Sequence, residues 1–214
     1  IMNPINYGKG KDVHLIRYAE DTFYMDHAPI TEQALVTFLH KSRDWFLSEY
    51  VHQADYLNQI YAETANTIRM IVFREPENHA FKVFFAVQRI GTSHTVPVDN
   101  GSRGGLVAKI NLETGVLSEA RSLHNLDIHE IHPDSRNPIR GVQIPNWNQL
   151  QREILDLSNN FPYLSFIAWD ILVTEEGFCV IEANTSSGVN IIQLWGGQRN
   201  GELGNFYRAH GIIK

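Results

Sequence analysis

Two carboxylates and one amide lie close together near the carboxyl-terminal end of the sequence. Asp170 lies within one apolar, strand-like stretch, and Glu182 and Asn184 end the next. A turn at Gly177 would join the stretches as a hairpin, and side chains two apart on a strand share a face. These oxygen donors suit a hard cation such as Mg²⁺. The alternative is that the acids lie on a solvated sheet face, which strand alternation also permits.

A histidine-rich segment offers a different metal chemistry. It contains His124, His129 and His132 together with Asp127 and Glu130. On a strand, Asp127 and His129 would share a face, and a further histidine would complete a set similar to a two-histidine, one-carboxylate iron site. The spacing matches no zinc signature. A polar loop is therefore the other interpretation of this segment.

The elements that must position these residues alternate irregularly between strand and helix. The expected strands cover residues 13–18, 45–51, 67–73, 81–90, 106–112, 166–173 and 178–182. The expected helices cover residues 32–41 and 148–159, and a last one starts after Gly188. Thr31 is a suitable cap for the first helix. Because hairpins replace regular βαβ alternation, the sequence predicts an α+β fold.

Composition excludes several classes of protein. Lys and Arg number 18 against 24 Asp and Glu, a net charge of −6, which disfavours nonspecific binding to nucleic acid or anionic lipid. No apolar run approaches the roughly 18 residues of a membrane helix, so we expect no membrane insertion. Cys179 is the single cysteine, and without an internal disulfide the chain fits a reducing, cytoplasmic compartment.

Asp170 and residues 182–188 resemble the metal-binding end of the ATP-grasp superfamily. Further similar segments follow in the expected order: residues 49–53, 66–69, 98–100, 104–105, 132–133 and 141–145. Together they resemble the branch associated with sugar transfer and surface polysaccharide genes. The resemblance implies an ATP-grasp fold, with an antiparallel-rich sheet and flanking helices.

The resemblance also implies a nucleotide site with three parts. Metal ligands would hold one or two Mg²⁺ between the β- and γ-phosphates of ATP, a glycine loop would close over the phosphates, and a hinge would bind adenine through its backbone. The metal ligands match Asp170, Glu182 and Asn184. The glycine loop matches Gly8, Lys9 and Gly10, and the adenine hinge matches Glu49, Tyr50 and Val51. Taken without the resemblance, the short glycine segment would be an ordinary hairpin turn.

The activity implied is that of an ATP-dependent carboxylate–amine (or carboxylate–thiol) ligase that forms an acyl phosphate. Its partners would be a small-molecule carboxylate and an amine, including sugar-linked ones. Arg69, Arg89 and Arg103 would stabilise the negative charge that develops on oxygens, a task suited to guanidinium groups. Asn100 and His132 would contact substrate. Without the resemblance, each arginine could equally form a surface ion pair.

Two features depart from the family pattern. Asn3 precedes Pro4 where many members have a lysine that contacts a phosphate, and the chain begins at Ile1 with no preceding domain. We therefore expect residues 1–51 to form part of the lid subdomain, and residues 52–214 the core subdomain with the metal site. The N-terminal part would be missing. The alternative function is a non-catalytic nucleotide- or sugar-binding module, or a truncated fragment.

Overall fold

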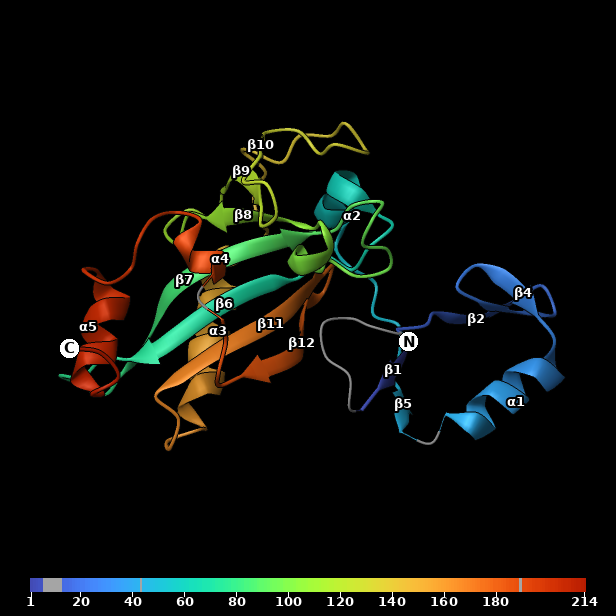
Figure 1. Ribbon diagram of the computed structural model, residues 1–214, viewed down its shortest axis with the longest axis horizontal. Coiled ribbons are helices and arrows are strands. Elements are labelled where there is room, and N and C mark those ends of the chain that lie inside the picture. Colours follow the sequence, from blue (N-terminus) through green and yellow to red (C-terminus); the bar gives the residue numbers. More distant parts are fainter. Residues whose placement is uncertain (6–12, 43, 189) are drawn as a thin grey trace. The chain divides into compact units, whose positions relative to one another are not determined.

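The computed structural model describes residues 1–5, 13–42, 44–188 and 190–214. Contacts divide the chain into two compact units, Ile1–His52 and Gln53–Lys214. Figure 1 labels most of the helices and strands of both units.

Within its described residues, the first unit contains two small antiparallel sheets and one helix. Its strands are β1 (Met2–Pro4), which pairs with β5 (Trp45–Leu47), and β2 (Ile16–Ala19), β3 (Thr22–Met25) and β4 (Ala28–Ile30). The helix predicted over residues 32–41 is confirmed as α1 (Glu32–Lys41). Its N-cap is Thr31, whose hydroxyl accepts a hydrogen bond from the Ala34 N–H at 3.2 Å, and such caps typically contribute about 1 kcal/mol.

The second unit is built on a seven-stranded antiparallel sheet with the strand order β10-β9-β8-β7-β6-β11-β12. Its strands are β6 (Ile68–Arg74), β7 (Phe81–Ile90), β8 (Leu106–Ile110), β9 (Leu117–Ser122), β10 (Ile128–His129), β11 (Phe166–Thr174) and β12 (Gly177–Asn184). Its helices are α2 (Asp55–Tyr61), the 3₁₀ turn η1 (Gly101–Arg103), α3 (Trp147–Asn159), α4 (Asn190–Gln193) and α5 (Glu202–Ala209). The predicted α+β class with an antiparallel-rich sheet is confirmed.

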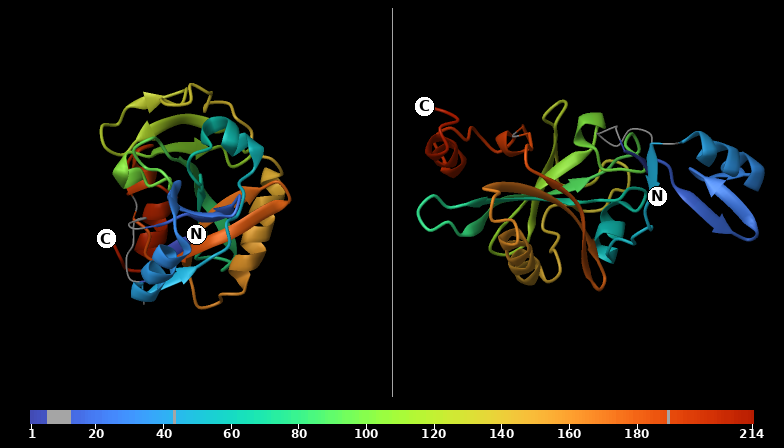
Figure 2. Two further views of the ribbon diagram at one scale, coloured as in Figure 1. Left: turned by 90° about the vertical axis from the view of Figure 1, so that its right-hand side faces the viewer. Right: turned by 90° about the horizontal axis from the view of Figure 1, so that it is seen from below.

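The two faces of this sheet carry different cores. One face packs against α3, where Leu150 and Ile154 meet Trp169 and Ile171 of β11. The opposite face packs against α4 and α5, and Figure 2 shows these helices on the other side of the sheet from α3. Since side chains alternate along a strand, Asp170 points away from the α3 face that Trp169 and Ile171 occupy. The carboxylate therefore lies on the α4–α5 face.

Candidate active site

Three charged residues oppose one another across neighbouring strands of the second unit. In the strand register, Asp170 of β11 pairs with Arg69 of β6 on one side and with Glu182 of β12 on the other. The β11–β12 register shifts after Asp170, because Ile171 pairs with Val180 and leaves Ile181 as an extra residue. A one-residue slip moves side chains to the opposite sheet face. This bulge therefore places Glu182 on the same face as Asp170.

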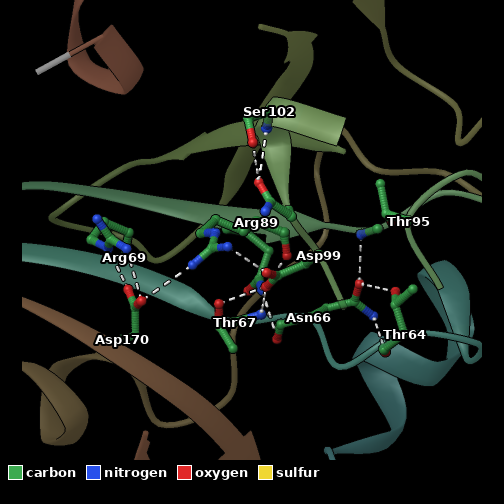
Figure 3. Close-up of polar contacts among 12 residues, drawn as sticks. Thr64, Asn66, Thr67, Arg69, Arg89, Thr95, Asp99, Ser102 and Asp170 are labelled. Carbon is green, nitrogen blue, oxygen red and sulfur yellow. Dashed lines mark hydrogen bonds and ion pairs between the residues drawn. The ribbon is translucent and has the colours of Figure 1, made fainter. Parts of the chain in front are cut away.

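Arg69 and Arg89 both bind the Asp170 carboxylate (Figure 3). Arg69 donates from Nε to Oδ1, and from Nη2 to Oδ2 over 2.8 Å. Arg89 donates from Nη1 to Oδ2 over 3.2 Å. Burial opposes the charge of Arg69, but the hydrogen bond to Asp170 and its negative charge raise the Arg69 pKa. Two cations are thus held against one carboxylate, whose side chain is 6% exposed.

Asp99 is the other acidic partner of Arg89, and it was not assigned a role from the sequence. Its Oδ1 lies 2.7 Å from Arg89 Nη2. Its Oδ2 accepts hydrogen bonds from the backbone N–H and the hydroxyl of Thr67, both at 2.6 Å. The only sequence signal was that Asp99 falls within a segment similar to the ATP-grasp pattern. We call Asp99, Arg89, Asp170 and Arg69 the charged cluster.

The three predicted metal ligands, Asp170, Glu182 and Asn184, share one face of the β11–β12 hairpin. Glu182 is exposed, and the Asn184 amide nitrogen donates to the Ala168 carbonyl over 3.5 Å. Carboxylate and amide oxygens fit a hard cation such as Mg²⁺. However, both Asp170 oxygens already accept hydrogen bonds from Arg69. A cation and the arginines would therefore compete for this carboxylate.

The comparison with protein families decides what kind of protein carries this arrangement. A model of the family described as sugar-transfer associated ATP-grasp matches residues 2–202. The chain belongs to this family. Comparison with curated proteins and with solved structures found no significant match. Membership confirms the resemblance stated above and indicates an ATP-dependent, ligase-like activity on small molecules.

The histidine-rich segment of this ATP-grasp chain does not form the alternative iron site. Within the described residues, no group of three or more His, Cys, Asp and Glu side chains is arranged to hold a metal ion. His124 instead contacts the Ser102 carbonyl through Nε2 at 2.9 Å. The segment is therefore better described as a loop region around the short strand β10.

His132 is buried rather than open to a ligand. Its Nδ1 accepts from the backbone N–H groups of Asp134 and Ser135, both at 3.2 Å, so the remaining proton is on Nε2, 2.8 Å from the Gly91 carbonyl. The ring also stacks on Tyr61, with the two centroids 4.5 Å apart. Because both nitrogens are engaged, we assign His132 to holding the loop and leave it out of the proposed substrate site.

This burial predicts a pH-dependent stability. Burial lowers the pKa of His132, and the charge of nearby His129 acts in the same direction, while the hydrogen bond to Gly91 and the charge of Asp134 oppose them. A lowered folded-state pKa means that the contribution of neutral His132 is complete above about pH 6.5 and is lost as the pH falls below it. The loss is at most about 1.4 kcal/mol per pH unit for one proton.

The measurement is the free energy of unfolding in urea between pH 8 and pH 5. We expect the free energy of unfolding to decline less steeply below about pH 6.5 in His132→Gln than in the wild type. His124→Gln, at an exposed histidine, should leave the slope of the wild type unchanged. Equal slopes for His132→Gln and the wild type would contradict a buried neutral imidazole.

The loop after β7 contains two further predicted residues, Asn100 and Arg103. The Asn100 Oδ1 atom accepts from the Ser102 N–H at 3.0 Å and from its hydroxyl at 2.8 Å, which starts η1. Arg103 is exposed within that turn. A Cβ atom at Gly105 would lie 2.7 Å from the Asp99 carbonyl oxygen, so glycine permits this close packing. The substrate roles of Asn100 and Arg103 stay predictions.

The predicted ATP-binding residues belong to the first unit. The glycine loop Gly8, Lys9 and Gly10 lies outside the described residues. Glu49 and Tyr50 are exposed in the segment after β5, and Val51 is partly buried. Their contact with nucleotide stays a prediction for this ATP-grasp chain. None of the helices in the described part of the chain has the length and apolar character to span a membrane.

Proposed function

We propose that this protein is an ATP- and Mg²⁺-dependent carboxylate–amine (or carboxylate–thiol) ligase that acts in surface polysaccharide or peptide-like metabolism. The observation that carries the proposal is the register of Arg69, Asp170 and Glu182 across three neighbouring strands, with Arg89 bound to the same Asp170. This arrangement combines oxygen donors for a cation with guanidinium groups for an anion on one sheet face.

The proposed reaction has two steps. A carboxylate oxygen of the first substrate attacks the γ-phosphorus of ATP, so that an O–P bond forms and ADP leaves. The amine then attacks the carbonyl carbon of this acyl phosphate. A C–N bond forms, phosphate leaves with the electron pair of the broken C–O bond, and the nitrogen loses a proton. Both steps place negative charge on oxygens, which positioned cationic groups stabilise.

The residues of the second unit would divide this work between them. Asp170, Glu182 and Asn184 would hold Mg²⁺, which neutralises phosphate charge when it is bound. Arg69 and Arg89 present paired donors that match phosphate and carboxylate oxygens. Asp170 binds both arginines on this sheet face.

The direct test is ADP release with Mg²⁺, ATP and a panel of carboxylates and amines. We expect Glu182→Gln to lower the rate at least about 100-fold, because a carboxylate ligand is lost while the exposed side chain leaves packing unchanged. Glu176→Gln is the matched control, since Glu176 is exposed in the turn of the same hairpin. Turnover that Glu182→Gln leaves unaffected would contradict the proposed metal site.

A non-catalytic nucleotide- or sugar-binding module is the second candidate. It is favoured by Asn3, a neutral residue in β1 at the position where many family members have a phosphate-binding lysine. Calorimetry with ATP and Mg²⁺, followed by the turnover assay, separates the two candidates. Binding without ADP release would support the module and contradict the ligase.

A further inference from the structure

Arg69 and Arg89 share Asp170, but their other partners differ in charge. Beyond Asp170, Arg69 donates from Nη1 to the neutral Ser187 hydroxyl at 2.8 Å. Arg89 has a second carboxylate, Asp99, 2.7 Å from its Nη2. A ligand that takes over Asp170 would therefore remove the carboxylate bonded directly to Arg69, which then feels only the more distant charges of Glu182 and Asp99. Arg89 would lose one of its two bonded carboxylates and keep Asp99.

Asp99 is itself fixed by its surroundings. The residue is 4% exposed, and Thr67 donates two hydrogen bonds to Oδ2 while Arg89 binds Oδ1. The Thr67 carbonyl in turn accepts the backbone N–H of Arg89 at 2.7 Å. Thr67 thus contacts both members of the Asp99–Arg89 pair. Charge-assisted hydrogen bonds of this kind are about twice as strong as neutral ones.

We propose that Asp99, anchored by Thr67, is a positioning residue that holds Arg89 in place whatever occupies Asp170, and that Arg69 is the arginine that moves. The inference rests on the proposed function, in which Asp170 binds a cation. Arg89 then provides a fixed anion-binding group in the reaction, and Arg69 is released from Asp170 when that carboxylate is taken. The two arginines are therefore not equivalent, although they bind the same acid.

A purely structural role for Asp99 predicts something different. The two Thr67 hydrogen bonds need only an acceptor oxygen, which an asparagine of the same size supplies. The negative charge is needed only for Arg89. Asp99→Asn therefore separates the loop contact from the hold on the guanidinium, and the fold should tolerate the exchange because residue volume is kept.

The first experiment needs no nucleotide, so it stands even if the protein never turns over ATP. NMR relaxation of the arginine Nε–H groups is measured in Asp170→Asn, with signals assigned from Arg69→Lys and Arg89→Lys. We expect Arg89 to keep an order parameter near the rigid value of about 0.85, and Arg69 to fall below about 0.6. Adding Asp99→Asn should release Arg89 as well. Equal mobility of the two arginines in Asp170→Asn would overturn the proposal.

The second experiment keeps Asp170 intact and serves even if Asp170→Asn does not fold. Asp99→Asn should lower kcat/KM for ADP release about 10- to 100-fold in the otherwise wild-type protein but less than about threefold in an Arg89→Lys background, because contacting residues couple.

Thr67 is tested in the same assay. Thr67→Ser keeps both donors to Asp99 and should retain wild-type kinetics, whereas Thr67→Val loses the hydroxyl donor and should not. Asp156→Asn, at an exposed acid of α3, is the control. If the effects of Asp99→Asn and Arg89→Lys on kcat/KM were additive, the positioning role would be overturned. If the wild type released no ADP, only the proposed function would be contradicted.

Discussion

Replacing Asp170 with asparagine is expected to lower the free energy of unfolding by about 2–4 kcal/mol and to abolish Mg²⁺-dependent ADP release. Removing one partner of a buried ion pair typically costs about 3–5 kcal/mol, because the other charge stays buried without a partner. The arginine side chains are 16% and 17% exposed, and this partial access to water reduces the expected cost. Urea unfolding at neutral pH measures the change.

Two comparisons make this prediction specific to the charged cluster. Asp156→Asn removes a carboxylate of the exposed face of α3, so it should change stability by less than about 0.5 kcal/mol. Glu182→Gln should abolish ADP release as Asp170→Asn does, yet leave unfolding unchanged, because Glu182 is exposed. If Asp170→Asn unfolded at the same urea concentration as the wild type, the ion pairs with Arg69 and Arg89 would not stabilise the fold.

The strands and helices with strong apolar patterns could be predicted from the sequence. The expected strand over residues 81–90 is confirmed as β7, and the expected helix over 148–159 begins one residue earlier as α3. The helix segment spaces its apolar residues at the helical period, and residues 81–90 form a nearly continuous run rich in aromatic and β-branched residues. The strand expected over residues 45–51 was too long, since β5 ends at Leu47.

The missed elements lack such local signals. The N-cap residue of α2 is Ala54, which has no side chain that can cap the helix, and the helix buries Leu57, Ile60 and Tyr61. Strand β9 has the sequence Leu-Ser-Glu-Ala-Arg-Ser, in which Leu117 and Ala120 are the buried apolar residues. Tertiary packing decides the structure of both segments, and a local pattern does not contain that information.

The candidate site, too, could be predicted in part from the sequence, while other parts of it depend on tertiary structure. Residue type and spacing singled out Asp170 and Glu182, because acids within apolar strands require partners when buried. Arg69 and Arg89 were expected to bind anions through the resemblance to the ATP-grasp pattern. The extra residue in β12 could not be predicted, since register depends on the partner strand. The pairing of Asp99 with Arg89 joins a loop to a strand, and its geometry depends on the conformation of that loop.

Asn66→Ala is the second substitution for which we expect a large effect, a loss of about 3–5 kcal/mol in the free energy of unfolding. Asn66 is fully buried. Its Oδ1 accepts from the Thr64 hydroxyl at 2.8 Å and from the Gly91 N–H at 2.9 Å, and its Nδ2 donates to the Tyr61 carbonyl at 2.7 Å. Each buried group left without a partner costs about 1–3 kcal/mol, and the contacts are shared within one network.

The consequence should extend to Arg89, because Asn66 precedes Thr67, the residue that fixes Asp99. Asn66→Asp tests this reasoning at constant volume. It keeps the Oδ1 acceptor but replaces the donor that faces the Tyr61 carbonyl with an oxygen, so it should destabilise the protein nearly as much as alanine does. Asn160→Ala removes an exposed amide and should cost less than about 0.5 kcal/mol in the same urea titration. If Asn66→Ala matched Asn160→Ala, the buried network would contribute little, and the fixed position of Thr67 would need another cause.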